Sequence, residues 1–222
     1  MCGRYSFVPN QDFAERFQVE NQQLELLPRY NVAPGQAMPV ITRNSPNRVE
    51  EMRWGLVPFW AKDPRIGNRM INARAETIAE KPAFRRPLAA RRCLVPANGF
   101  YEWQRSEEGK LPHYIFLRDT DSFAFAGLYE IWKDDADNVL RTYTIITTTP
   151  NALMEPIHNR MPVILGREDE ALWLDKAAEI PALLALLRPY PAELMDAYPV
   201  SRAVNSPANE GEALIEPEPA AG

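Results

Sequence analysis

The chain begins Met1-Cys2-Gly3-Arg4, and Cys2 is the residue with the most distinctive chemistry. Bacterial processing usually removes Met1 when the next side chain is this small, which would leave Cys2 with a free α-amine beside its thiol. An α-amine has a pKa of about 7.7–8, so a useful fraction is neutral and nucleophilic near neutral pH. Such a cysteine can close nitrogen and sulfur onto one aldehyde carbon as a thiazolidine. The alternative is that position 2 merely tolerates cysteine.

Two further polar residues stand in apolar surroundings. Asn72 follows Ile71 at an expected strand end, where its amide would either orient a neighbouring group or cap the following turn. Glu102 stands between Tyr101 and Trp103. If Glu102 is buried, desolvation raises its pKa and suits it to proton transfer; if the strand simply alternates, the carboxylate faces water.

His158 lies between proline and apolar residues in the segment 156–163. A histidine titrates near neutrality and can act as acid or base, although a satisfied structural histidine explains the same pattern. Arg160 shares its face if the segment is extended, which suits a phosphate or a developing oxyanion. Trp54 and Trp60 belong either to the core or to an aromatic platform for unpaired bases, where stacking contributes roughly 1–3 kcal/mol per base. The adjacent arginines favour the platform, so we expect both tryptophans to contact DNA.

Charge is distributed unevenly along the chain. The formal net charge is −5, but residues 53–92 hold 10 Lys and Arg against 3 Asp and Glu. Of the 25 basic residues, 20 are arginines, whose planar guanidinium forms bidentate contacts with phosphate. An ordinary solvated face is the alternative. A local basic surface can nevertheless bind an anion on an acidic protein, because nearby charges set the field there.

The elements that must position these residues are mostly strands. Alternating apolar residues predict strands at 38–42, 49–57, 93–95, 101–104, 113–117, 122–132 and 140–148, with an extended segment at 29–35. Helical patterns are short and cover 12–17, 76–80, 151–155, 168–174 and 181–187. Short turns at 107–110 and 134–138 connect strands. This pattern predicts one α+β domain with a mainly antiparallel sheet.

Length and composition limit the remaining possibilities. The 222 residues suit one domain, 1–206, followed by an acidic and flexible tail, 207–222. No apolar run approaches the roughly 18 residues of a membrane span, and no secretory signal is present, so we expect a cytoplasmic protein. With two cysteines, no CxxC motif and two histidines, we expect no metal and no cofactor. We also expect a monomer.

Together, seven segments resemble the SRAP family, the SOS response-associated peptidases or abasic-site processing proteins. They appear in the family's order and cover the chain to about residue 206: Met-Cys-Gly-Arg at 1–4, Arg-Tyr-Asn-Val-Ala-Pro at 29–34, Arg-Trp-Gly-Leu-Val-Pro-Phe-Trp at 53–60, Ile-Asn-Ala-Arg-Ala-Glu-Thr at 71–77, Arg-Cys-Leu-Val-Pro-Ala-Asn-Gly-Phe-Tyr-Glu-Trp at 92–103, Ile-His-Asn-Arg-Met-Pro-Val-Ile-Leu at 157–165, and Pro-Val-Ser with Ala-Val-Asn at 199–205.

The resemblance implies a β-barrel-like core with short peripheral helices and a positively charged groove for single-stranded DNA. It also implies a covalent crosslink between Cys2 and the aldehyde of an abasic site. By the same resemblance, the residues that line the site around Cys2 are Asn72, Glu102 and His158. The residues expected near DNA phosphates are Arg4, Arg74 and Arg160, with Arg85 and Arg86 added.

The chemistry of the residues agrees with that implication. Glu102 or His158 can protonate the ring oxygen of the closed sugar, and the α-amine then forms an imine that the thiol closes. Strand cleavage by β-elimination is the expected side reaction, and removal of Met1 by the protein itself would account for the word peptidase. Two alternatives remain: a class II glutamine amidotransferase that uses Asn98-Gly99 in its oxyanion hole, and a DNA-damage binding module that forms no crosslink.

Overall fold

A closed five-stranded barrel forms the larger part of the molecule. The computed structural model describes residues 2–20, 25–43, 47–107 and 109–218. The barrel strands are β3 (Ala37–Arg43), β4 (Asn47–Trp54), β6 (Arg92–Ala97), β9 (Phe123–Lys133) and β10 (Val139–Thr148). Their order is β10-β4-β3-β6-β9, and pairing of β9 with β10 closes the ring. The β4–β10 pair is parallel and the others are antiparallel.

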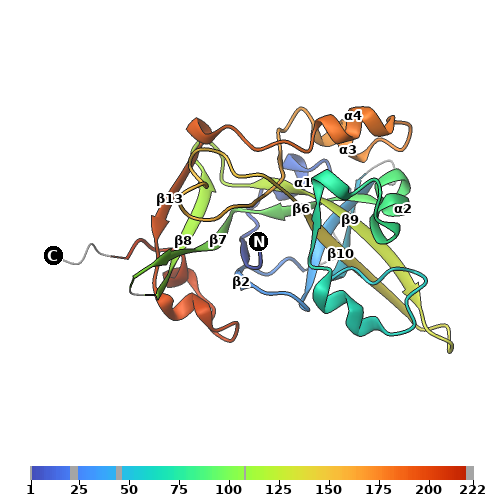
Figure 1. Ribbon diagram of the computed structural model, residues 1–222, viewed down its shortest axis with the longest axis horizontal. Helices are drawn as coiled ribbons and strands as arrows, with labels where there is room; N and C mark the ends of the chain where they lie inside the picture. Colours follow the sequence, from blue (N-terminus) through green and yellow to red (C-terminus); the bar gives the residue numbers. More distant parts are fainter. Residues whose placement is uncertain (1, 21–24, 44–46, 108, 219–222) are drawn as a thin grey trace.

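Three short strands extend the barrel, and a second sheet packs beside it (Figure 1). The extensions are β5 (Asn72–Arg74), β11 (Met161–Pro162) and β12 (Ile164–Leu165). The second sheet has the order β13-β8-β7-β1-β2 and consists of β1 (Tyr5–Phe7), β2 (Arg29–Val32), β7 (Gly99–Ser106), β8 (Gly109–Leu117) and β13 (Met195–Pro199). Only Asn98 separates β6 from β7, so one stretch of chain links both sheets.

The helices are short and lie at the periphery. The α-helices are α1 (Phe13–Arg16), α2 (Pro82–Ala90), α3 (Glu170–Leu174) and α4 (Ile180–Ala185). The 3-10 helices are η1 (Pro64–Arg69), η2 (Ala75–Thr77), η3 (Ala192–Leu194), η4 (Arg202–Asn205) and η5 (Glu212–Leu214). No described helix is long and apolar enough to cross a membrane.

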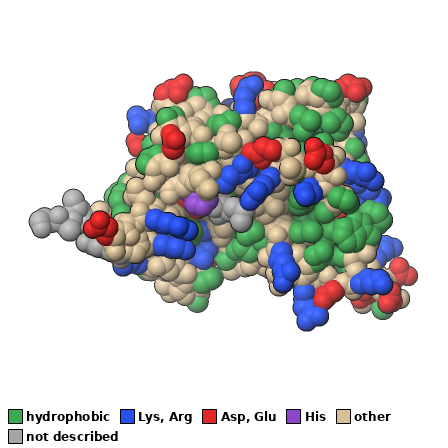
Figure 2. Space-filling model, in the orientation of Figure 1, with side chains coloured by type: hydrophobic (Ala, Val, Ile, Leu, Met, Phe, Trp, Pro, Cys, Tyr) green, Lys and Arg blue, Asp and Glu red, His purple; other side chains and the backbone are tan. Residues whose placement is uncertain are grey.

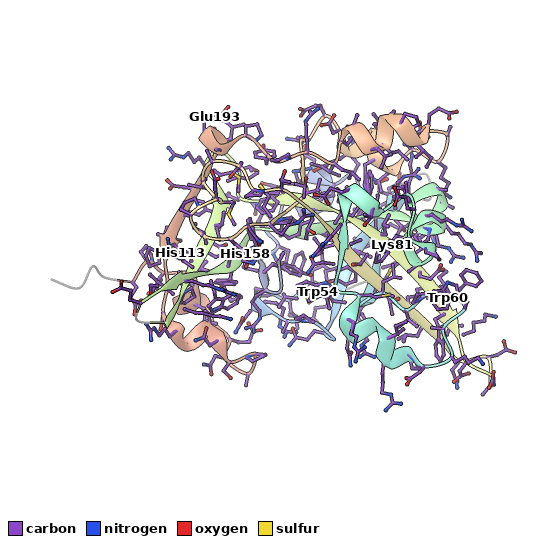
Figure 3. All side chains as sticks on the ribbon, viewed as in Figure 1. Trp54, Trp60, Lys81, His113, His158 and Glu193 are labelled. Carbon is purple, nitrogen blue, oxygen red and sulfur yellow. The ribbon has the colours of Figure 1, made fainter. Side chains whose placement is uncertain are left out.

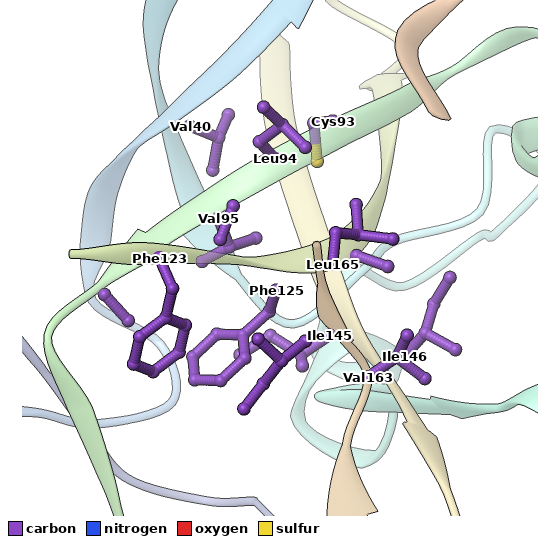
Figure 4. Close-up of a cluster of buried hydrophobic side chains, with 14 of the residues drawn as sticks. Val40, Cys93, Leu94, Val95, Phe123, Phe125, Ile145, Ile146, Val163 and Leu165 are labelled. Atoms are coloured by element: carbon purple, nitrogen blue, oxygen red, sulfur yellow. The ribbon is translucent and has the colours of Figure 1, made fainter. Parts of the chain in front are cut away.

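The barrel interior is filled by the inward side chains of its strands. Figure 4 shows Val95, Phe125 and Ile145 from three different barrel strands meeting in this core. Phe125 also contacts Tyr5 edge to face, with ring centroids 5.9 Å apart. The core therefore continues from the barrel to the first strand of the second sheet, and this packing fixes the start of the chain against the barrel wall.

The fold class is confirmed, and the seven predicted strands are present with boundaries shifted by a few residues. Two local expectations differ. Residues 151–155 form turns instead of a helix. In the segment 76–80, only the first two residues belong to a 3-10 helix, η2, and the rest form a turn. The predicted turn at 134–138 is present, with Asp137 N donating to Asp134 O. The turn at 107–110 includes Glu108, which lies outside the described residues.

The acidic C-terminal segment is not a flexible tail as far as residue 218. Glu210 accepts hydrogen bonds from Arg29 Nε at 3.0 Å and from Tyr30 N at 2.9 Å. Leu214 is 5% exposed, and Glu218 N donates to Pro199 O at 2.8 Å. The segment 207–218 thus packs on the second sheet, because Glu210 forms hydrogen bonds with β2 and Leu214 is buried there. Residues 219–222 lie outside the described part of the chain.

Candidate functional site

Cys2 lies at the junction of the two sheets, where the dark blue start of the described chain sits in the middle of Figure 1. Its side chain is 0% exposed. The Asn72 Nδ2 group donates to the Cys2 carbonyl oxygen at 2.8 Å. Asn72 Oδ1 is buried and has no hydrogen-bond partner among the described residues. The amide therefore orients Cys2 and does not cap the turn that follows, which decides between the two interpretations of Asn72.

Strand β5 holds Asn72 in this position. It pairs in parallel with β10, where Asn72 lies opposite Ile145. Immediately before it, the Ile71 carbonyl accepts a hydrogen bond from Trp54 Nε1 at 2.8 Å. Because Trp54 is itself 1% exposed and packs against Tyr143, the start of β5 is anchored to the barrel wall.

Glu102 is buried on β7 with only 3% of its surface exposed, so it does not face water. Burial raises the pKa of Glu102, and the nearby His158 opposes that rise. His158 Nε2 lies 4.0 Å from Glu102 Oε2. On the other side of the ring, His158 Nδ1 accepts a hydrogen bond from Arg160 N at 3.0 Å. The same Nδ1 also lies 3.2 Å from the Arg160 carbonyl oxygen, and Nε2 is the ring nitrogen that faces Glu102.

The Cys2 thiol is held in its protonated form. Burial raises the pKa of Cys2 far above its ordinary value, and the Glu102 carboxylate adds to the rise. A hydrogen bond from the backbone of Arg4 partly opposes it. A buried neutral thiol is a weak nucleophile compared with its thiolate, so the site does not activate sulfur as a free thiolate.

Arg160 is fixed by a partner that the sequence analysis did not assign. Its guanidinium binds both carboxylate oxygens of Glu76, at 2.5 and 2.9 Å, and also the Thr147 carbonyl at 2.7 Å. This pair lowers the pKa of Glu76. Thr147 is in turn the cross-strand neighbour of exposed Arg74, so both arginines lie beside the same end of β10.

The remaining predicted DNA contacts lie in different surroundings. Arg4 is 9% exposed, and its Nη1 donates to Asn31 Oδ1 and Val204 O at 2.6 Å each. Its contact with DNA stays a prediction, while these bonds give it a structural part. Trp54 is a core residue that leaves no open face for a base. The expectation that it stacks on DNA is therefore wrong, because its ring packs inside the barrel wall.

Trp60 belongs to a separate surface patch. It is 49% exposed, as is its neighbour Phe59 at 48%, and the guanidinium of Arg86 lies 4.2 Å from the Phe59 ring centroid. Arg85 and Arg86 are both exposed on α2. Figure 3 places Trp60 near the opposite side of the view from His158, with Trp54 between them. The structure therefore gathers Cys2, Asn72, Glu102 and His158 at one point, while this patch stands apart.

A cavity of about 450 Å³ opens next to Glu102 and His158. The sequence analysis missed its four other lining residues: Trp103, Arg105, Lys110 and Asn205. Register of the β7–β8 hairpin would have placed Arg105 and Lys110 together, whereas no sequence signal connects Asn205 to a strand one hundred residues earlier. Among the described residues, no group of three or more His, Cys, Asp or Glu is placed to hold a metal ion.

The Asn98-Gly99 pair is occupied by the backbone of β1 and its extension. Asn98 Oδ1 accepts from Val8 N at 2.6 Å, and Asn98 Nδ2 donates to Val8 O at 3.1 Å. Its Nδ2 also donates to Asp121 O. Because these bonds use both groups of its side-chain amide, Asn98 has a structural function. It is therefore not available as the oxyanion-hole donor that the amidotransferase alternative requires.

Comparisons with known proteins identify the family of this chain. A family model described as SOS response associated peptidase (SRAP) matches residues 1–207. The abasic site processing protein YoqW of Bacillus subtilis is 51% identical, covering 97% of this chain and 99% of its own. The abasic site processing protein HMCES of Xenopus tropicalis is 34% identical, covering 82% of this chain and 64% of its own. A crystal structure of a Bacteroides thetaiotaomicron protein superimposes with a TM-score of 0.90 at 33% identity, covering 98% and 100% of the two chains. The chain belongs to the SRAP family.

Proposed function

We propose that this protein processes abasic sites in single-stranded DNA by forming a covalent crosslink through Cys2. One observation supports the proposal most directly: two polar side chains interact with Cys2. The Asn72 amide donates to the Cys2 backbone at 2.8 Å, and the charge of the buried Glu102 raises the pKa of the Cys2 thiol. The relatives named above are called abasic site processing proteins, which supports the same substrate.

The proposed reaction begins with opening of the closed sugar. Glu102 stays protonated to higher pH than an exposed glutamate because it is buried, so it can donate a proton to the departing ring oxygen. A His158 imidazolium, whose Nε2 lies 4.0 Å from Glu102 Oε2, can then return a proton to the Glu102 carboxylate and become neutral imidazole. Asn72 holds the Cys2 backbone while the aldehyde approaches, and this positioning supplies much of the rate advantage.

The bond-forming steps use both nucleophiles of Cys2. After removal of Met1, which lies outside the described residues, the α-amine adds to C1′ and loses one water to give an imine. The thiol sulfur then adds to the same carbon and its proton passes to nitrogen, closing a thiazolidine. The net reaction is aldehyde plus aminothiol giving thiazolidine plus water. Because the pKa of the thiol is raised by burial, the neutral amine is expected to attack first.

Two side activities follow from the same intermediate and the same site. The imine acidifies the C2′ proton, so slow β-elimination would cut the strand unless the thiol closes first. Closure therefore shields the lesion during a DNA-damage response. We further propose that the site hydrolyses the Met1–Cys2 bond, which would explain the family description as a peptidase.

A denaturing gel tests the proposal. Met1-free protein incubated with single-stranded DNA bearing one abasic site should give a denaturant-stable adduct that Cys2→Ala abolishes. Cys2→Ser keeps the amine and loses the thiol, so it should give a borohydride-trappable imine and more strand cleavage. Cys93→Ala, at the other buried cysteine, is the control and should leave the adduct intact. An equal adduct yield from Cys2→Ala would overturn the proposal.

The same assay separates the non-covalent alternative. A binding module without crosslinking would retain abasic DNA under native conditions and release all of it in denaturant. Glutamine hydrolysis in the absence of DNA would instead revive the amidotransferase hypothesis, against the structural position of Asn98.

A further inference from the structure

The cavity beside Glu102 and His158 has two chemically different walls. Glu102 and His158 form the wall that belongs to the site already described. The other wall carries the two cations Arg105 and Lys110, both exposed. Among the described residues that line the cavity, Glu102 is the only acid, and it is buried with a raised pKa. The cavity therefore presents net positive charge to whatever enters it.

Hairpin register makes this pair of cations unusual. Arg105 lies directly opposite Lys110 in the antiparallel β7–β8 ladder. Like charges at directly opposed positions destabilise a hairpin, because their side chains are close on one face. Neither cation forms an ion pair with any residue in the described parts of the chain. A bound anion would relieve this repulsion, and a cavity to hold it lies beside the pair.

Strand β1 does not continue along this part of β7, where Gln104 Nε2 donates to Pro156 O at 3.1 Å. Strand β1 pairs with β7 only at Gly99 and Phe100, so the β7 edge beyond Tyr101 has no β1 partner. Arg105 follows Glu102 by three residues, about 10 Å along a strand that rises roughly 3.3 Å per residue. Alternation places the two side chains on opposite faces of β7, so the cavity that both residues line extends around the edge of the strand. An anion held by Arg105 would therefore lie close to a sugar reacting at Cys2, within the span of a nucleic-acid strand.

The wall between the cations and the site is fixed. Trp103 Nε1 donates to Asn205 Oδ1 at 2.7 Å, and the Arg4 guanidinium lies 5.8 Å from the Trp103 ring centroid. Figure 2 shows basic side chains next to the histidine that reaches this face of the molecule. Because Trp103 is held in place, the cavity keeps its shape beside Glu102. A site that binds one phosphate needs such a fixed shape.

We propose that Arg105 and Lys110 together bind one backbone phosphate of a nucleotide flanking the abasic sugar. This inference rests on the proposed function. It places a DNA contact on the β7–β8 side of the site, whereas Arg74 and Arg160 lie on the β5–β10 side. A strand bound by both sides crosses directly over Glu102 and His158, which would press the sugar toward Cys2.

The first test is the salt dependence of binding. The probe is single-stranded DNA with one tetrahydrofuran abasic analogue, which lacks the aldehyde and cannot react. One phosphate contact contributes about 0.7 to the slope of log K against log salt for single strands. Arg105→Gln/Lys110→Gln should therefore weaken binding and reduce the magnitude of this negative slope by about 0.7. The matched control Lys133→Gln/Arg141→Gln removes the same charge from two exposed residues of the β9–β10 hairpin and should change the slope much less.

The second test locates the phosphate. Replacing single linkages by neutral methylphosphonates should weaken wild-type binding at one linkage that flanks the lesion, and Arg105→Gln/Lys110→Gln should be insensitive at that linkage alone. A slope equal to that of the control, or unchanged sensitivity at every linkage, would overturn the inference. Removal of the like charges should leave the hairpin at least as stable, so a lower unfolding midpoint for the double variant would also contradict it.

Failure of the inference and failure of the proposed function give different results. Aldehyde-bearing DNA is incubated with the wild-type protein in parallel. Formation of the Cys2-dependent adduct with an unchanged methylphosphonate profile would overturn only the Arg105–Lys110 contact. No adduct at all from the Met1-free wild-type protein would overturn the proposed function itself, whatever the binding profile shows.

Discussion

At the scale of single residues, burial of Glu102 is both useful and costly. A carboxyl that is 3% exposed keeps its proton to higher pH than usual, which an acid catalyst near neutrality needs. Above that pKa the folded protein must hold a charge away from water, which costs stability. In the sequence, Glu102 stands between two aromatic residues. Alternation along a strand does not show which face of the sheet is buried, so the burial of Glu102 could not be predicted.

The burial of Glu102 predicts a pH-dependent stability difference. The pKa of Glu102 is raised in the folded state above the ordinary value of 4.5, so stability is lost as pH rises from about 4.5 through the raised pKa. Glu102→Gln should therefore unfold at higher denaturant concentration than wild type at pH 7, and the difference should disappear below about pH 4.5. Urea unfolding at several pH values measures this. A variant that is less stable at pH 7 would contradict it.

The hydrogen bond from Asn72 to Cys2 predicts a kinetic effect much larger than its effect on stability. Asn72→Ala removes the 2.8 Å bond that orients Cys2, and loss of positioning should slow adduct formation by about 10²-fold. The free energy of unfolding should fall by only about 1 kcal/mol. Single-turnover gel kinetics and urea unfolding give the two values.

Asn151→Ala is the matched control for Asn72→Ala. It removes another amide-to-carbonyl bond, from Asn151 Nδ2 to Tyr190 O at 2.7 Å, together with the bond that Asn151 Oδ1 accepts from Met154 N at 2.9 Å, and both lie outside the site. Because it loses more hydrogen bonds, Asn151→Ala should cost at least as much stability as Asn72→Ala, and it should leave the rate of adduct formation unchanged. Equal slowing by both variants would show that Asn72 acts through general stability and not by orienting Cys2.

At the scale of elements, the longer strands could be predicted and the site-forming short elements could not. Alternation over 122–132 predicts β9 almost to its ends. Strand β5 has only three residues, too few for a periodic signal, and exists because β10 and Trp54 hold it. Helix α2 was missed because it contains Pro87, which weakens any helical prediction. Tertiary contacts, not local pattern, thus position Asn72.

The junction of β6 and β7 predicts a packing defect that would displace the strand of Glu102. A Cβ on Gly99 would overlap the ring of Tyr114, whose hydroxyl lies 2.9 Å from Ser6 Oγ. Gly99→Ala should therefore cost about 1–3 kcal/mol of unfolding free energy. The cost should shrink in a Tyr114→Leu background, as a double-mutant cycle in urea can measure. Additivity within about 0.5 kcal/mol would contradict direct overlap.

At the scale of the whole molecule, η4 and the segment 207–218 pack against residues from the beginning of the chain. Val204 accepts a hydrogen bond from Arg4, and Asn205 accepts one from Trp103, so residues from the end of the chain support residues near its beginning. Acidic composition predicted a flexible tail beyond 206. Composition cannot reveal that Glu210 will meet Arg29 and Tyr30, about 180 positions away, and such long-range partners decide whether a polar segment is ordered.

Docking of this segment predicts a stability effect from its one buried leucine. Leu214 packs with Tyr101, Tyr114, Val200 and Val204 and is 5% exposed. Leu214→Ala should lower the unfolding free energy by about 2–3 kcal/mol. Leu194→Ala, at a leucine that is 39% exposed, is the control and should cost much less. Equal small losses from both would show that the segment contributes little to the fold.

The central claim is that the nitrogen and the sulfur of Cys2 both bond to one carbon of an abasic site. The most direct measurement is NMR of the adduct between ¹⁵N-labelled, Met1-free protein and single-stranded DNA carrying ¹³C at C1′ of its abasic sugar. We expect a saturated C1′ signal with one-bond coupling to the Cys2 nitrogen, stable in denaturant. A C1′ signal without nitrogen coupling, or one that remains an imine, would contradict it.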